Sequence, residues 1–252
     1  MDLQLRGKRA IVTGGSRGIG KAIARQLALE GVDVVISARN QERLRAAANE
    51  LASETGRRII PVVADTGDAK AVDSLVATTV AELGGVDILV NNAAVPGGIS
   101  SATQLAEIVD QQVLDDIDIK VVGYLRTARA VAPHLIKNGW GRIINIGGLA
   151  IDKTGRPVAT LRNVGVAAIS KNLGDELGAR GINVVALHPG ATRTERTDPK
   201  AEAQLASSSS IGRIVDASEV AYVVAFLASP LSVAINGDAI RVGGGSRGTI
   251  HY

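Results

Sequence analysis

A glycine-rich turn near the amino terminus carries the residue types that bind a phosphate chain. The turn reads TGGSRGIG over residues 13–20 and directly follows a β-branched run, RAIVT. Glycines let the backbone approach a pyrophosphate closely, and the amino terminus of a following helix presents unpaired N–H groups to it. A glycine cluster taken alone is equally compatible with an ordinary turn. Its place between a strand pattern and a helix pattern favours a dinucleotide, with contacts predicted from Gly14, Ser16, Arg17, Gly18, Ile19 and Gly20.

Two arginines stand where the adenosine end of such a dinucleotide is expected. Proteins that bind NAD(H) commonly place an acidic residue at the end of the second strand, where it binds the ribose 2′-hydroxyl. This chain has Ala38 and Arg39 there. Arg39, together with Arg17 of the glycine turn, would complement a 2′-phosphate, although two solvated surface arginines would leave the same pattern. NADP(H) is therefore the expected cofactor, and NAD(H) the less favoured one.

The elements that must position these groups alternate along the chain. β-Branched runs occur at 9–13, 32–37, 58–64, 86–90, 141–146, 182–187 and 239–243, and helical patterns at 21–30, 41–54, 69–83, 121–138, 160–179 and 217–227. Strands that alternate with helices in this way need right-handed crossovers and a sheet covered on both faces. The pattern predicts an α/β fold of Rossmann type, a doubly wound parallel sheet with helices on both faces, in a single domain over 1–252.

Composition argues against several other kinds of chemistry and partner. Cysteine is absent and the three histidines, His134, His188 and His251, are far apart, so we expect no metal site. A net charge of +3, with few aromatic residues, disfavours nucleic acid as a partner. No apolar run reaches the roughly 18 residues of a membrane span, and the first residues lack a signal-peptide core. We therefore expect a soluble, cytoplasmic protein that does not bind membranes and acts on a small molecule.

Four segments of the chain resemble the short-chain dehydrogenase/reductase family. The turn at 13–20 matches the family's TGxxxGxG motif, and NNAA at 91–94 looks like its NNAG segment. PGATRT at 189–194 matches PGxxxT, and the tail at 237–245 looks like the family's last strand and glycine pair. The segments extend over nearly the whole chain. Beyond the glycine turn, the resemblance implies cofactor contacts from Asp65, Asn91, Ala93, Pro189, Gly190 and Thr194, with Asp65 facing the adenine and Thr194 the nicotinamide amide.

The resemblance also locates the positions where family members carry a catalytic Asn-Ser-Tyr-Lys set. In that set Tyr is the acid/base, Lys lowers the pKa of the Tyr and holds the ribose, Ser binds the carbonyl oxygen and Asn anchors a proton-relay water. DIKVVG at 118–123 and GRIINIGG at 141–148 align with the family's DVNxxG and GRIINISS. The corresponding residues here are Lys120, Gly148, Ala159 and Asn163. No tyrosine lies between 149 and 170, so a shifted alignment does not restore the set.

Lys120 is the only ionisable residue at those four positions. An inward-facing side chain would have a pKa lowered by burial and by neighbouring cations, and would serve as an acid or an electrostatic stabiliser. The alternative is a helix lysine paired with Asp116 or with a cofactor oxygen. Asn163 is expected to hydrogen-bond the nicotinamide ribose. Arg162, with Arg156 and Lys153 in the preceding loop, would make the pocket mouth cationic and favour an anionic substrate, unless these are ordinary surface cations.

Three functions remain open on the sequence alone. The favoured one is an NADP(H)-dependent oxidoreductase that acts on an unknown carbonyl, alcohol or imine with a non-standard acid/base group, because hydride transfer needs mainly a well-placed nicotinamide. The others are a non-catalytic NADP(H)-binding sensor or structural partner, and a non-redox enzyme on the same fold. Because relatives commonly assemble through the helices expected at 121–138 and 160–179, we also expect a homo-oligomer, either a tetramer or a dimer.

Overall fold

Seven parallel strands form the central sheet of the protein. The computed structural model describes residues 1–247, so His251 lies outside the described residues. The strand order is β3-β2-β1-β4-β5-β6-β9, which confirms the predicted doubly wound sheet. The strands are β1 (Arg9–Thr13), β2 (Asp33–Ala38), β3 (Ile59–Val63), β4 (Ile88–Asn91), β5 (Gly141–Ile146), β6 (Ile182–Pro189) and β9 (Ala239–Val242).

The inner strands are hydrophobic because helices cover both of their faces. Every residue of β4, β5 and β6 is buried. Such strands show continuous apolar runs rather than an alternating pattern, which is the pattern found at 86–90 and 182–187. The predicted ranges differ from the observed strands and helices by no more than three residues at either end.

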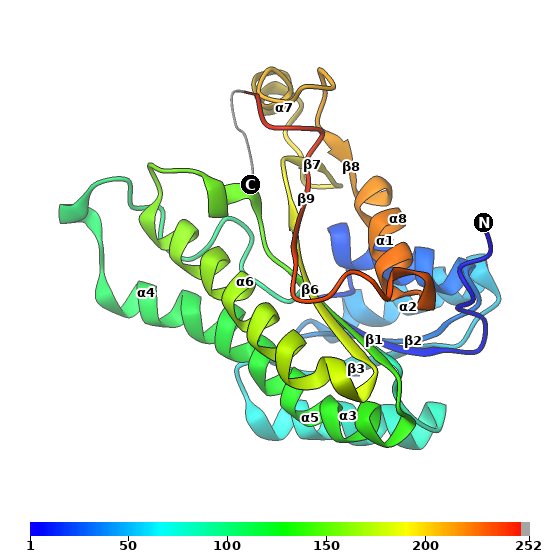
Figure 1. Ribbon diagram of the computed structural model, residues 1–252. Coiled ribbons are helices and arrows are strands. Elements are labelled where there is room, and N and C mark those ends of the chain that lie inside the picture. The colour runs from blue at the N-terminus through cyan, green and yellow to red at the C-terminus, as the bar shows by residue number, and fades with distance from the viewer. Residues whose placement is uncertain (248–252) are drawn as a thin grey trace.

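Helices lie in two layers around the sheet (Figure 1). One layer contains α1 (Gly18–Leu29), α2 (Gln41–Thr55) and α8 (Ala217–Ala228), and the other contains α3 (Ala69–Leu83), α5 (Gly123–Asn138) and α6 (Pro157–Leu177). Ile23 and Val224 belong to the apolar core under the first layer, and Leu75 and Leu135 to the core under the second.

Local signals set several helix ends. The Asn40 side chain accepts a hydrogen bond from the Arg43 N–H at the start of α2, and Asp68 does the same for Lys70 at the start of α3. Each of these two helices ends at a glycine in the left-handed conformation. Such caps satisfy N–H and C=O groups that a helix end leaves free.

The segment after β4 is more complex than the single helix predicted at 121–138. It contains α4 (Asp110–Ile117) and a π-helix, η2 (Asp118–Val122), before α5 begins at Gly123. The Gly123 N–H bonds to the carbonyl oxygen of Asp118, five residues earlier. Such wide turns frequently occur at functional sites, because they change the direction of one or two side chains.

Smaller elements lie beyond the carboxyl end of β6. These are β7 (Thr192–Arg193), α7 (Pro199–Ala206) and β8 (Val215–Asp216), at the top of Figure 1. The remaining short helices are η1 (Leu105–Glu107), η3 (Leu149–Asp152), η4 (Gly178–Arg180) and η5 (Pro230–Ser232). Among the residues described, none of the helices has the length and hydrophobicity needed to cross a membrane.

Candidate functional site

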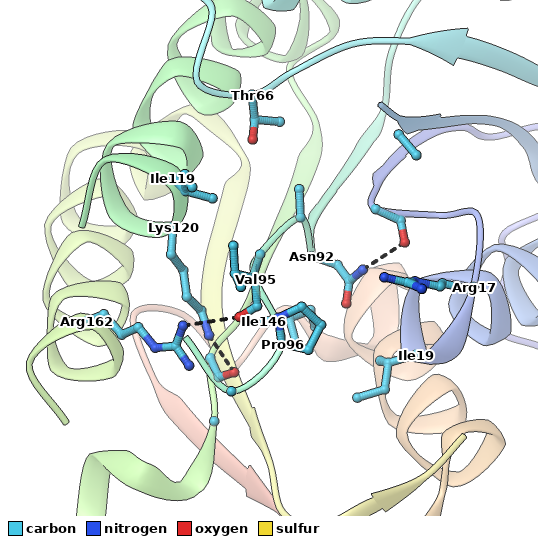
Figure 2. Close-up of a pocket in the computed structure, with 18 of the residues that line it drawn as sticks. Arg17, Ile19, Thr66, Asn92, Val95, Pro96, Ile119, Lys120, Ile146 and Arg162 are labelled. Atoms are coloured by element: carbon cyan, nitrogen blue, oxygen red, sulfur yellow. Dashed lines mark hydrogen bonds between the residues drawn. The ribbon is translucent and has the colours of Figure 1, made fainter. Parts of the chain in front are cut away.

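A cleft of about 1000 Å³ opens at the carboxyl ends of the strands, and the loops after β1, β2, β4, β5 and β6 line it. Figure 2 shows Arg17 and Ile19 on one side of it and Lys120 and Arg162 on the other. The strand order reverses between β1 and β4, and open parallel sheets bind their ligands at that point. The cleft is therefore the first candidate for the functional site.

The glycine turn forms a close backbone cradle at one end of the cleft. Gly14 has a φ of +66°, and a Cβ atom there would lie 2.9 Å from the Asn92 amide nitrogen. A Cβ atom on Gly20 would lie 2.3 Å from the Gly14 carbonyl oxygen. Asn92 ties the loop after β4 to this turn, because its side chain donates to the carbonyl oxygens of Thr13 and Gly14 at 3.1 and 3.2 Å. Only glycine leaves room for this approach of two loops.

Twelve of the predicted cofactor residues line the cleft: Gly14, Ser16, Arg17, Ile19, Gly20, Arg39, Asp65, Ala93, Asn163, Pro189, Gly190 and Thr194. They come from segments far apart in the sequence. The fit to a dinucleotide therefore rests on a cradle that requires glycine at one end, basic side chains beyond it and a continuous cavity.

Gly18 and Asn91 do not line the cleft, so their predicted contacts with a cofactor stay predictions. The Gly18 N–H, at the start of α1, donates to the Glu195 carboxylate at 3.2 Å. The Asn91 side chain is fully buried, donates to Asn145 at 2.9 Å and accepts from Thr127 at 2.6 Å. Asn91 thus links β4 to β5 and α5 beneath the site.

The adenosine end of the expected site is rich in arginine. Arg17 and Arg39 both line the cleft and are exposed, and Arg39 lies 3.8 Å from the Asp65 carboxylate. Arg43, in the first turn of α2, lines the same region. Partial burial and the nearby charges of Arg196 and Arg43 lower the pKa of Arg17. These cations repel one another, so an anion placed among them would be stabilised.

Lys120 turns inward from the π-helix. Only 5% of its surface is exposed, and its ammonium donates to the Gly147 carbonyl oxygen at 2.9 Å and to the Asn163 amide oxygen at 3.0 Å. Burial, together with the charge of Arg162, lowers the pKa of Lys120 to about 7, and Asp116 opposes that shift. The inward orientation considered from the sequence is the one observed, and the alternative pairing with Asp116 is not.

The other three positions of the expected catalytic set surround Lys120 with neutral groups. Gly148, Ala159 and Asn163 all line the cleft. The Asn163 amide donates to the Ala159 carbonyl oxygen at 2.8 Å, which directs its own oxygen toward the Lys120 ammonium. Lys120 is therefore the one group of the four that can exchange a proton near neutral pH.

Arg162 is buried within the site, whereas we expected it at the pocket mouth. Its Nη1 donates to the Asp116 carboxylate at 3.2 Å and to the Val95 carbonyl oxygen at 3.3 Å. Helix α6 projects it toward α4, where Asp116 forms an ion pair with it. Arg156 is exposed and lines the cleft, as expected for the mouth, but Lys153 is not among the lining residues. The cationic part of the cleft thus extends into its interior.

His188 hydrogen-bonds to the backbone next to the carbonyl group that accepts from Lys120. It is fully buried, and its Nδ1 lies 3.1 Å from the Gly148 nitrogen and 3.2 Å from the Gly148 carbonyl oxygen. Burial lowers the pKa of His188 to about 4, which keeps it neutral at pH 7. Among residues 1–247, no cluster of three or more histidine and acidic side chains could hold a metal ion.

The residues that line the cleft but were not predicted from the sequence include Arg43, Asn92 and Arg196. Arg43 could have been predicted from the sequence. It lies three residues after the Asn40 cap, in the first turn of α2, and is therefore close to Arg39 at the end of β2. Asn92 is adjacent to a predicted contact. Arg196 had no such signal, because only the path of the loop after β7 brings it to the glycine turn.

The sequence of this chain is similar to those of a known protein family. A family model described as Enoyl-(Acyl carrier protein) reductase matches residues 14–247. The 3-oxoacyl-(acyl-carrier-protein) reductase FabG of Haemophilus influenzae is 33% identical over 247 residues, which cover 96% of this chain and 98% of the relative.

Two solved structures are similar along almost their whole length. L-Sorbose reductase from Gluconobacter frateurii, complexed with NADPH and L-sorbose, has a TM-score of 0.91 and 29% identity, covering 99% of this chain and 100% of that one. A short chain dehydrogenase from Burkholderia cenocepacia J2315, in complex with NADP, has a TM-score of 0.86 and 34% identity, covering 96% and 98%.

Proposed function

The chain belongs to the short-chain dehydrogenase/reductase family, and from this premise we propose that it is an NADP(H)-dependent oxidoreductase that uses Lys120 as its acid. Its substrate is a small-molecule carbonyl, alcohol or imine. One observation carries the catalytic part of the proposal: a lysine with a pKa of about 7 is buried at the inner end of the cleft, and its ammonium donates to two neutral acceptors.

Three observations support NADP(H) as the cofactor. Two neighbours of similar fold were crystallised with NADPH or NADP. The glycine cradle at Gly14 and Gly20 leaves backbone room for a pyrophosphate. Arg17, Arg39 and Arg43 line the end of the cleft where a 2′-phosphate is expected, and a charge-assisted contact there would favour NADP(H) over NAD(H).

A bound nicotinamide cofactor would supply hydride-transfer chemistry at the substrate carbon. Lys120 transfers the proton that accompanies the hydride. Its ammonium donates this proton to the carbonyl oxygen during reduction, and its neutral amine accepts a proton from the alcohol during oxidation. An ammonium has three N–H donors, and Gly147 and Asn163 accept two of those of Lys120. The third is available to a substrate oxygen.

Lys120 and Asn163 exchange the residue types that family members carry at these positions. The resemblance implies an asparagine at 120 and a lysine at 163, and here each residue stands in the other's place. Their side chains are hydrogen-bonded across the cleft wall. The π-helix can therefore place an ammonium in the region that a lysine of α6 would otherwise reach. This supports an acid role for Lys120, although Gly148 and Ala159 replace the serine and tyrosine of the usual set.

The proposal is tested by titrating the protein with NADPH and then screening carbonyls and imines for loss of nicotinamide absorbance. Turnover that disappears in Lys120→Met, with NADPH affinity unchanged, is the expected result. Lys137→Met, an exposed lysine of α5, is the matched control. Tight NADP(H) binding without turnover of any compound would instead favour the non-catalytic sensor or structural partner.

Assembly and location remain proposals. We propose a homotetramer or homodimer, because Leu161 and Val164 of α6 are apolar and exposed, at 51% and 45%. Burial of this face against a second copy would remove apolar surface from water. A monomer in light scattering at micromolar concentration would contradict this. We also propose that the protein works in the cytoplasm, which fractionation of the native cell would test.

A further inference from the structure

We propose that the substrate carries a carboxylate close to its reacting carbonyl, and that Arg162 binds this carboxylate beside Lys120. The inference rests on the proposed function, because it assigns the substrate class of the same site. Figure 2 shows the Arg162 and Lys120 side chains converging on one region of the cleft.

Arg162 has more hydrogen-bond donors than its surroundings use. Its side chain is 7% exposed, yet both of its hydrogen bonds within the described residues leave from Nη1. Its Nε is buried and has no partner. The Nε and Nη2 side of a guanidinium is one that binds a carboxylate through two parallel hydrogen bonds. A buried donor without an acceptor is uncommon and calls for an explanation, and a substrate carboxylate is the one that we propose.

The charges at the inner end of the cleft sum to positive when Lys120 is protonated. Lys120 and Arg162 each carry a positive charge, and among residues 1–247 Asp116 is the one acidic residue that forms an ion pair with either. The Asp116 carboxylate also accepts backbone N–H groups from Ile99 and Ser100, so it serves the loop as well as Arg162. An anionic ligand would complete the neutralisation.

Neighbouring residues leave space for such a group. Gly148 and Ala159 bring no hydroxyl into this part of the cleft, and both line it. Gly98 lets the loop after β4 close over the ion pair, because a Cβ atom there would lie 2.9 Å from Asp116 Oδ2 and 3.0 Å from Arg162 Nη1. The loop thus holds Nη1 in place without adding a side chain that would fill the cavity.

Proximity of the two cations limits the distance between the carboxylate and the carbonyl of the substrate. If Arg162 binds the carboxylate while Lys120 donates to the carbonyl oxygen, the two groups lie a few bonds apart, as in short oxo acids. A long acyl chain with a distant carboxylate would not reach both. The substrate class is therefore a short oxo acid rather than a neutral ketone.

The test compares oxo acids with their methyl esters, which have nearly the same shape but no charge. Suitable probes are 2-oxobutanoate and 3-oxobutanoate and the methyl ester of each. With NADPH, we expect kcat/KM to be about tenfold or more higher for at least one acid than for its ester, a preference of the size of one charged hydrogen bond. Arg162→Gln should abolish it mainly through KM, and Arg129→Gln, an exposed arginine of α5, should not.

Removal of Arg162 leaves Asp116 buried without its partner, so Arg162→Gln alone could fail to fold. The double variant Asp116→Asn with Arg162→Gln removes both charges and keeps the experiment interpretable. Arg162→Lys keeps a charge beside Asp116 but loses the planar edge, and it too should lose the acid-over-ester preference.

Calorimetry on the NADP⁺-loaded protein separates this inference from the proposed function, because no reduction is possible there. Binding of an acid that exceeds binding of its ester, and that is lost in Arg162→Gln, supports the carboxylate site even if no compound is reduced. Reduction of esters as efficient as that of both acids would overturn the inference while the proposed function stands. An unchanged preference in every Arg162 variant would also overturn it.

Discussion

The Lys120 ammonium lies 3.0 Å from the amide oxygen of Asn163, across 43 residues of sequence. This bond joins the π-helix η2 to α6 at the inner wall of the cleft. It fixes the direction of both side chains, because the Asn163 amide nitrogen in turn donates to the carbonyl oxygen of Ala159. A buried lysine with two acceptors and no directly paired carboxylate is poised to lose its proton near neutral pH.

Replacement of Lys120 by methionine should lower turnover by about 10²- to 10⁴-fold, the usual contribution of a positioned acid. NADPH affinity should change little, since most of the predicted cofactor contacts lie on the opposite side of the cleft. Steady-state kinetics and a fluorescence titration check the two parts. A variant that reduces carbonyls as fast as the wild type would show that the acid lies elsewhere.

Reduction should slow as the pH rises through about 7, because Lys120 must be protonated to donate and its pKa is about 7. The charged and titratable groups that face it are Arg162 from α6, Asp116 from α4 and His188 from β6. His188, with a pKa near 4, is already neutral in this range. A pH profile of kcat measures the effect. A rate that climbs steadily from pH 6 to pH 9 would contradict the assignment.

Stability should increase with pH above about 7 for the same reason. The unfolded chain keeps the ordinary lysine pKa of 10.5, whereas the folded chain loses its proton near 7, so between these values the unfolded state binds more protons. The free energy of unfolding therefore rises with pH in that window. Urea unfolding at pH 7 and pH 9 should show a smaller rise in Lys120→Met than in the wild type or Lys137→Met. Equal rises in all three proteins would indicate that Lys120 is not buried.

The double variant in which Lys120 and Asn163 are exchanged should be more stable than either single variant. Asn163→Lys alone would bring a second ammonium against Lys120, and we expect a clear loss of thermal stability. The double variant Lys120→Asn with Asn163→Lys restores one ammonium and one amide. A double-mutant cycle should therefore yield a coupling free energy of about 0.5–3 kcal/mol. Additive effects of the two substitutions would contradict the contact.

Replacement of Arg39 by aspartate should weaken NADP(H) binding by about 1.5–3 kcal/mol, the range for a charged hydrogen bond. Calorimetry with NADPH and NADH measures the affinity and the selectivity together. Arg45→Asp, on an exposed position of α2 outside the cleft, controls for the change of net charge. Equal affinity of the wild-type protein for NAD(H) and NADP(H) would contradict the proposed preference.

Replacement of Gly98 by alanine should destabilise the protein more than the same change at Gly97. Both residues have positive φ, +93° and +77°, and a left-handed alanine costs about 1–2 kcal/mol at either position. A Cβ atom at Gly98 would also press on the Asp116–Arg162 pair, whereas Gly97 has open space around it. Thermal unfolding of the two variants isolates the difference. Equal losses would mean that the loop does not close on the ion pair.

Features that depend on neighbours along the chain could be predicted from the amino-acid sequence. The alternation of apolar strands and amphipathic helices was sufficient for the parallel sheet, because covered parallel strands require that pattern. The glycine turn was recognisable because a strand precedes it and a helix follows it. Arg39 was predicted as a phosphate ligand for a similar reason, since the end of β2 has a known place in such sheets.

The arrangement of side chains in the interior of the site became visible in the folded structure alone. The sequence left Lys120 between two states, because its burial depends on Gly147 and Asn163, 27 and 43 residues away. The sequence predicted Arg162 at the mouth of the pocket. In the structure α6 packs against α4, and Arg162 forms a buried ion pair with Asp116. The π-helix and the path of the loop carrying Arg196 had no local signal. Burial, unsatisfied donors and shifted pKa values arise from atoms that folding brings together, and spacing along the chain does not encode those distances.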